Sequence, residues 1–110
     1  MDNESFIKAV KYNEKGLVPV ITQDNQTGEV LMLAWMNEDA LKLTLERKRM
    51  VYFSRSRQEL WQKGDTSGHF QNLVSISIDC DGDTLLAKVI QEGAACHTGN
   101  RTCFFRNLDL

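Results

Sequence analysis

The chain has 110 residues, of which 42% are hydrophobic and 25% are charged, a composition typical of one globular domain. Its formal net charge of −2 argues against the basic surface that nonspecific nucleic-acid binding requires. No apolar run approaches the roughly 18 residues of a membrane span, and the acidic, polar N-terminus has no secretory-signal pattern. We therefore expect a single domain over residues 1–110, located in the cytoplasm, with neither a nucleic-acid nor a membrane partner.

The first predicted feature is a β-hairpin. Residues 17–21 read as a strand, placed at a sheet edge because Pro19 cannot donate a ladder hydrogen bond. Residues 24–28 have the composition of a turn, and residues 30–35 form a nearly continuous apolar strand. The two strands flank the turn closely enough to pair with each other.

A helix is predicted next. Asn37 is placed to cap its N-terminus, and acidic residues follow where the helix dipole favours them. The apolar periodicity predicts a helix over residues 38–50. Its inward face carries Ala40, Leu41, Thr44 and Leu45.

Beyond the helix the chain becomes mostly β. The Asp81-Gly82 pair between two apolar segments is a strong signal for a tight hairpin. The predicted fold class is α+β, a mostly antiparallel β-sheet with one main helix. The further strands are expected at residues 51–54, 59–62, 73–78, 85–90 and 102–105.

Three aspartates alternate with other residues in one short segment, namely Asp79, Asp81 and Asp83. Alternate residues of an extended segment point the same way, so the carboxylates are expected to converge while Cys80 points elsewhere. Three acids on one side repel one another unless a cation lies between them, and carboxylate oxygen suits a hard cation such as magnesium. An EF-hand is excluded because Thr84 and Ile90 stand where its loop needs glycine and glutamate. The alternative to a metal site is a solvated acidic turn.

The chain carries three cysteines, which are Cys80, Cys96 and Cys103. An odd number cannot close a disulfide framework within one chain, and a reducing compartment keeps thiols free to bind metal. Thiolates suit zinc, and three of them leave one tetrahedral position for water, as in catalytic sites. His97 could fill that position, which would make the site structural. The spacings match neither a zinc ribbon nor a nucleobase deaminase.

His97 and His69 are the only histidines, so each is a candidate acid or base near neutral pH. His69 follows a polar loop rich in hydroxyl groups and glycine. Backbone N–H groups at glycine turns, and guanidinium groups, suit phosphate oxygens, although a solvated loop is the alternative. The candidate phosphate-binding residues are Arg55, Arg57, Lys63, Thr66 and Ser67.

Together these motifs resemble the phosphoribosyl-AMP cyclohydrolase family of histidine biosynthesis. The resemblance spans roughly residues 17–107, nearly the whole chain, and the motifs occur in the family's order. The matching segments are residues 34–37, 52–57, 60–69, 79–83 and 95–99, followed by Cys103-Phe104.

The resemblance implies a metal-dependent hydrolysis that opens the adenine ring of 1-(5-phosphoribosyl)-AMP between N1 and C6. The product would be the formimino-aminoimidazole carboxamide ribotide of the third step of L-histidine biosynthesis. It implies one zinc per subunit on Cys80, Cys96 and Cys103, shared across a homodimer, and one magnesium per subunit on the three aspartates. His97 and His69 would move protons, with their two roles unassigned.

Two positions depart from the family pattern, because Ala94 replaces the usual proline and Asp65 the common glutamate. No fused pyrophosphohydrolase domain is expected, so another polypeptide would supply the substrate. A noncatalytic zinc-stapled interaction module, with His97 as the fourth ligand, is the alternative from another class. Deamination of a free purine is a second enzymatic alternative, but its zinc signature is absent and it would release ammonia.

Overall fold

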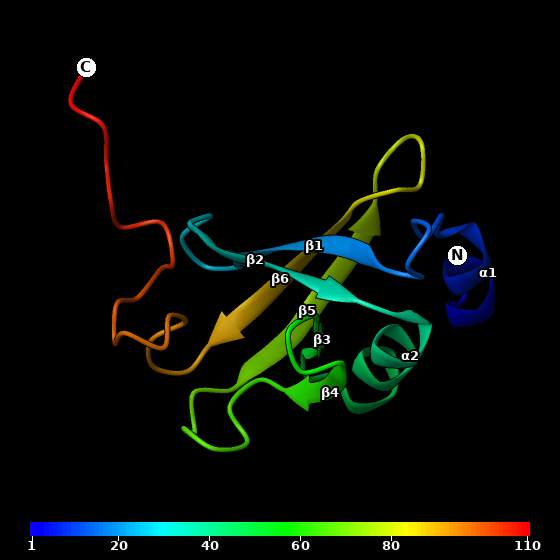
Figure 1. The fold of residues 1–110 in the computed structure, drawn as a ribbon, viewed down its shortest axis with the longest axis horizontal. Coiled ribbons are helices and arrows are strands. Elements are labelled where there is room, and N and C mark those ends of the chain that lie inside the picture. The colour runs from blue at the N-terminus through cyan, green and yellow to red at the C-terminus, as the bar shows by residue number, and fades with distance from the viewer.

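The structure, a computed structural model, describes residues 1–110 and contains two helices and six strands (Figure 1). The α+β class and the mostly antiparallel sheet are confirmed. No helix is long and apolar enough to cross a membrane. In chain order the elements are α1 (Asn3–Ala9), β1 (Val18–Asp24), β2 (Val30–Met36), α2 (Glu38–Arg47), β3 (Val51–Ser54), β4 (Glu59–Gln62), β5 (Gln71–Ile78) and β6 (Leu85–Gln91).

The main sheet has four strands in the order β2-β1-β6-β5, and β3 and β4 form a separate hairpin. Both hairpins of the main sheet are antiparallel, whereas β1 and β6 pair in parallel. The prediction that the first strand lies at an edge is therefore wrong. Pro19 is tolerated in this inner strand because the pairing with β6 begins only at Val20, so the missing N–H lies outside that ladder.

Helix α2 begins as predicted and ends three residues early. The Asn37 side chain accepts a hydrogen bond from the backbone N–H of Ala40 at 2.8 Å. The helix stops at Arg47 because Lys48 adopts a left-handed conformation, with φ of 57°, and donates its N–H to the carbonyl of Thr44. The predicted inward face is buried throughout.

Two features at the chain ends differ from the predictions. Helix α1 was not expected; Asp2 caps it by accepting from the N–H of Ser5 at 2.8 Å, and Phe6 is its buried anchor. No strand forms over residues 102–105. Cys103 donates one backbone hydrogen bond to Leu31 at 2.8 Å, but no ladder follows. Figure 1 shows the C-terminal segment leaving the body of the fold as an extended chain.

The hydrophobic core packs the inner face of the main sheet against α2 and β3. A buried polar chain crosses it, in which the Tyr52 hydroxyl lies 2.8 Å from Thr22 Oγ1 and 2.6 Å from Gln71 Oε1. Gln71 Nε2 donates to Gln91 Oε1 at 2.7 Å, and Gln91 Nε2 donates to the carbonyl of Glu92 at 3.1 Å. This last hydrogen bond links the core to Glu92, the first residue of the loop that follows β6.

Candidate active site

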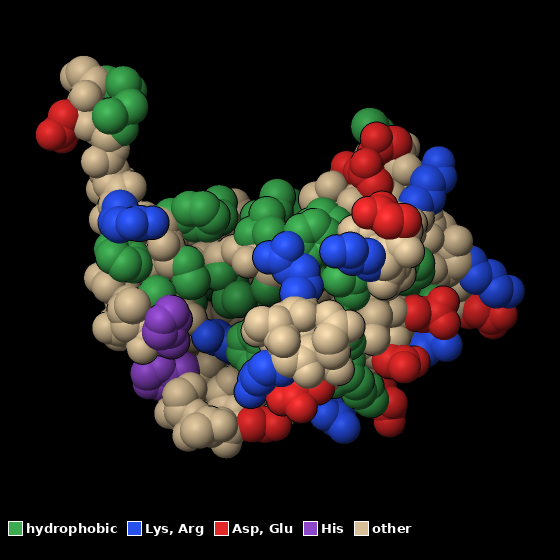
Figure 2. All heavy atoms as spheres, viewed as in Figure 1, with side chains coloured by type: hydrophobic (Ala, Val, Ile, Leu, Met, Phe, Trp, Pro, Cys, Tyr) green, Lys and Arg blue, Asp and Glu red, His purple; other side chains and the backbone are tan.

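A cavity of about 750 Å³ lies between β2, the β3–β4 hairpin and two loops, at residues 63–69 and 93–103. It gathers most of the residues that the sequence predicted for catalysis, thiol ligation and phosphate binding. Both histidines line it, and Figure 2 shows them next to each other on the visible face. The predicted residues in its lining are Arg57, Lys63, Thr66, Ser67, His69, Cys96, His97 and Cys103.

Two of the three thiols meet at this cavity. Cys96 is buried, and Thr98 Oγ1 donates a hydrogen bond to its sulfur at 3.0 Å. This bond, with help from Cys103 and the charge of Lys63, lowers the pKa of Cys96. Desolvation, together with the neighbouring Cys96, raises the pKa of Cys103. The pair therefore has one thiol prepared for ionisation, which suits the ligation of a soft metal ion.

Lys63 ties the β4 side of the cavity to the thiol loop. Its ammonium donates a hydrogen bond to the carbonyl of Ala95 and lies 5.6 Å from the centre of the Trp61 ring. Burial lowers the pKa of Lys63, and the two nearby thiols oppose that effect. The side chain is thus a structural contact of the thiol loop as well as a candidate phosphate ligand.

His69 has one ring nitrogen engaged and one free. Its Nδ1 lies 3.1 Å from the carbonyl oxygen of Ala94. Because a carbonyl only accepts, Nδ1 carries the proton, and the neutral ring has its lone pair on Nε2. Nε2 makes no hydrogen bond within the chain.

The close packing of His69 depends on Gly93, which the sequence analysis did not single out. A Cβ added at Gly93 would lie 2.5 Å from Cδ2 of the His69 ring, and the glycine has a φ of 76°. A glycine two residues after a strand is an ordinary turn signal, so nothing in the local sequence marks this contact. His97 differs, because it lies exposed in the turn that follows Cys96.

Arg55 does not reach this cavity. Its guanidinium lies 4.8 Å from the centre of the Trp35 ring, and it lines a second hollow of about 220 Å³. Arg57, two residues later, lines the large cavity and pairs with Glu59 at 3.4 Å. The residues predicted to form one phosphate-binding site therefore line two different spaces, the large cavity and the smaller hollow.

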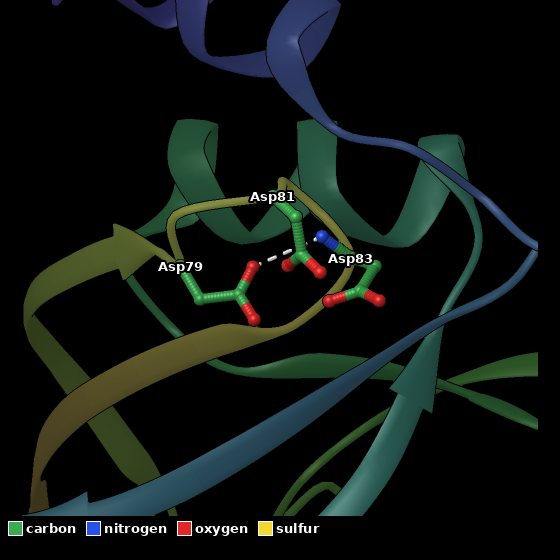
Figure 3. Close-up of side chains that lie close together, drawn as sticks. All are labelled: Asp79, Asp81 and Asp83. Carbon is green, nitrogen blue, oxygen red and sulfur yellow. Dashed lines mark hydrogen bonds between the residues drawn. The ribbon is translucent and has the colours of Figure 1, made fainter.

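The three aspartates converge in the turn between β5 and β6, as Figure 3 shows. One oxygen from each carboxylate lies within 4.8 Å of the others, so the predicted convergence is confirmed. The predicted extended segment is wrong, because Gly82 turns the chain with a φ of 81°. Asp79 Oδ1 accepts from the backbone N–H of Asp83 at 3.0 Å and of Thr84 at 3.3 Å. The turn, rather than strand alternation, brings the carboxylates together.

The carboxylates influence one another's ionisation. Desolvation acts to raise the pKa of Asp79, but the hydrogen bonds from Asp83 and Thr84 outweigh it and lower that pKa. Hydrogen bonding with Asp81 and Asp79 raises the pKa of Asp83. A cation between the three oxygens would relieve this conflict.

The acidic turn is braced by the segment that follows α1. Lys11 donates its backbone N–H to the carbonyl of Gly82 at 2.8 Å. A Cβ at Gly82 would lie 2.9 Å from the carbonyl oxygen of Ala9, so only glycine fits this approach. The unexpected N-terminal helix therefore contributes to the position of the aspartates.

Cys80 lies in the same turn and is exposed. Strand β6, which covers Leu85–Gln91, separates it from Cys96 and Cys103. Its length corresponds to about 20 Å at the rise of a strand. The three cysteines therefore do not meet within one chain.

Residues 32–105 match the family model described as phosphoribosyl-AMP cyclohydrolase. A protein of that name from Chlorobium phaeobacteroides is 58% identical over 105 residues, which cover 96% of this chain and 77% of the relative. One from Prosthecochloris aestuarii is 59% identical over 103 residues, 94% of this chain and 75% of the relative. A histidine biosynthesis bifunctional protein from Thermus thermophilus is 57% identical over 102 residues, 93% of this chain and 48% of the relative.

Proposed function

The chain belongs to the phosphoribosyl-AMP cyclohydrolase family, and we propose that it hydrolyses the N1–C6 bond of 1-(5-phosphoribosyl)-AMP in histidine biosynthesis. The observation that carries this proposal is the family match across residues 32–105, which contain every thiol, histidine and aspartate of the candidate site. We also propose a cytoplasmic location, on the ground that a reducing compartment keeps an odd number of thiols free.

We propose that zinc binds Cys96 and Cys103 of one chain together with Cys80 of a second copy, so that the enzyme is a homodimer with shared sites. The support is the separation of Cys80 from the other thiols by the length of β6. The donor set fits the ion, because a thiol pair with one lowered pKa suits zinc. When bound, zinc supplies a Lewis acid that lowers the pKa of water.

We propose magnesium at the acidic turn, with one ion per subunit. The support is the approach of three carboxylate oxygens to within 4.8 Å of one another, a spacing that a hard cation can bridge. An ion held there by Asp79, Asp81 and Asp83 would neutralise or orient substrate phosphate. Arg57, Thr66 and Ser67, which line the large cavity, would bind phosphate oxygen directly.

His69 is the better proton acceptor of the two histidines. With Nδ1 committed to the Ala94 carbonyl, its Nε2 can take the proton from the water that attacks C6. The new C6–O bond makes C6 a carboxamide that keeps its exocyclic nitrogen. Cleavage of N1–C6 then leaves N1 as a formamidine nitrogen, and it must gain a proton, for which exposed His97 is the candidate donor. No ammonia is released.

The test is an absorbance assay of ring opening with protein loaded with zinc and magnesium, together with metal analysis and an ammonia assay. We expect turnover, one zinc per chain, a further requirement for magnesium and no ammonia. Fully metal-loaded protein that binds zinc but shows no turnover would instead favour the zinc-stapled interaction module. Release of ammonia would favour a deaminase.

A further inference from the structure

The second hollow and the large cavity are lined by different residues of the β3–β4 hairpin. Arg57 lines the cavity, whereas Arg55 and Gln58, from the same turn, line the hollow. We infer that this hollow binds one of the two phosphates of the substrate, and that Lys15 and Arg55 are its ligands. This inference rests on the function proposed above. The residues lining the hollow are Lys15, Leu17, Asn37, Phe53, Arg55 and Gln58.

The charge of the hollow suits an anion. It is lined by two cationic side chains and by no acidic one. Neither Lys15 nor Arg55 takes part in an ion pair. Among the acids adjacent in sequence to its lining residues, Glu38 pairs with Lys42 at 3.0 Å and Glu59 pairs with Arg57 at 3.4 Å, whereas Glu14 is exposed and does not line the hollow. The two cationic side chains of the hollow are therefore not paired with a carboxylate in its lining.

Arg55 is held in a position from which it can bind. Its guanidinium carbon lies 4.8 Å from the centre of the Trp35 ring, a cation–π contact that favours this position, and its N–H donors make no hydrogen bond within the chain. The turn that carries it is closed by Gln58, whose Nε2 donates to the Arg55 carbonyl at 2.7 Å. A guanidinium with free edge donors forms the paired hydrogen bonds that phosphate oxygens accept.

The size and position of the hollow suit one end of a ligand whose remaining part lies in the large cavity. A volume of about 220 Å³ is below the usual range of pockets that hold a whole ligand, whereas the cavity of about 750 Å³ is within it. Met32 and Ala34 of β2 line the cavity, and Asn37 lines the hollow. Ala34 and Asn37 are three residues apart, which corresponds to about 10 Å of extended chain between the lining of the cavity and that of the hollow.

The substrate has two phosphates to be bound. It carries its phosphates on two riboses, attached at N1 and N9 on different sides of the purine. Two separate groups of cationic side chains therefore suit it better than one. The large cavity, with Arg57, Thr66 and Ser67, would bind one phosphate, and the hollow would bind the other.

The kinetic test compares Lys15→Gln and Arg55→Gln with the control Lys88→Gln, which removes an exposed cation of β6 that lines neither space. Loss of a charged hydrogen bond to bound substrate should raise KM about tenfold in each of the first two variants, with most of the effect in KM rather than in kcat. The control should keep the wild-type KM. Unchanged KM in both Lys15→Gln and Arg55→Gln would overturn the inference.

A second measurement does not depend on turnover. The chain has two tryptophans, and Trp35 lies under Arg55 while Trp61 lines the large cavity. Titration with ribose 5-phosphate should shift the Trp35 indole N–H resonance in the wild-type protein, and Arg55→Gln should lose that shift. A Trp35 signal that does not respond in the wild type would overturn the phosphate site. Absence of ring opening in the wild type, with the Trp35 shift intact, would instead refute only the proposed reaction.

Discussion

The two ends of strand β6 assemble their metal-binding candidates in different ways. At its start, the turn with Asp79, Asp81 and Asp83 brings three carboxylate oxygens within 4.8 Å of one another using five consecutive residues. At its end, the loop after β6 brings together only Cys96 and Cys103, and the third thiol lies in the opposite turn. Ligands that are close in sequence can come together within one chain, whereas the proposed zinc site would take its third thiol from a second copy.

The braces of the two ends also differ. Backbone contacts hold the acidic turn, because the N–H of Lys11 donates to Gly82. At the thiol loop, side chains add to the backbone bond from Cys103 to Leu31, since Arg101 pairs with Asp24 at 3.2 Å and with Glu29 at 3.1 Å, and Thr102 Oγ1 donates to Val30 at 2.8 Å. We therefore expect the thiol end to be more sensitive to substitution and to assembly than the acidic end.

The largest effect should come from Cys103→Ser. Replacing a thiolate by a hydroxyl weakens the binding of a borderline-soft ion, so zinc content and ring opening should fall together, the latter by at least about a thousandfold. Metal analysis and the absorbance assay measure the two quantities on one sample. Full activity in zinc-depleted Cys103→Ser protein would refute the thiol site.

Mixing two inactive variants tests whether the thiol site is shared. Cys80→Ala and Cys103→Ala should each be inactive alone. Random exchange of subunits makes half of the dimers mixed, and each mixed dimer has one intact site of two, so about a quarter of the wild-type activity should return. If each site lay within one chain, mixing would restore nothing.

Substituting Gly93 tests the pose of His69. A methyl group there would lie 2.5 Å from the His69 ring, so Gly93→Ala should lower kcat about tenfold to a hundredfold with a smaller change in KM. Gly68→Ala is the matched control, because its φ of 78° is close to the 76° of Gly93 and no atom lies within 4 Å of the added Cβ. Added imidazole should partly rescue His69→Ala. Equal kinetics in the two glycine variants would contradict the positioning role.

A smaller effect is expected at the acidic end. Asp81→Asn removes one charge from a hard-cation site, so the magnesium concentration for half-maximal activity should rise about tenfold. Zinc content should stay at the wild-type level, because Asp81→Asn leaves all three thiols in place, including the neighbouring Cys80. Loss of zinc with unchanged magnesium dependence would show that the division into two sites is wrong.

The smallest effect concerns the brace of the thiol loop. Arg101→Gln removes two partly exposed ion pairs, with Asp24 and Glu29, so the free energy of unfolding should fall by about 1 kcal/mol near pH 7. Hydrogen bonds from Thr27, aided by Arg101, lower the pKa of Asp24. Stability from that carboxylate is present above its unfolded pKa and is lost as the pH falls through the lower folded pKa. The difference between wild type and variant in denaturant titrations should therefore shrink in that acidic range, and a constant difference would argue against the pair.

Local signals in the sequence predicted the local structure well. The two main-sheet hairpins, the Asn37 cap and the buried face of α2 follow from turn residues and periodicity, and the structure confirms them. The errors arise where contacts between residues distant in sequence determine the structure. Pro19 lies in an inner strand, where it is tolerated because the pairing with β6 begins only one residue later.

The site shows the same limit. The aspartates converge because they are neighbours in the chain, although the turn rather than an extended strand brings them together. The separation of Arg55 from Arg57, and the fit of Gly93 against His69, depend on how the β3–β4 hairpin and the loop after β6 pack. No pattern within either segment records that packing.

The buried polar chain in the core has a fixed direction of hydrogen-bond donation. The carbonyl of Glu92 can only accept, so the amide of Gln91 must present its nitrogen there and its oxygen to Gln71. The Gln71 oxygen then accepts from the Tyr52 hydroxyl, whose own oxygen is left to accept from Thr22. Every link is polarised in one direction, so the core can be repacked by size only if the replacement side chains keep the same order of donors and acceptors.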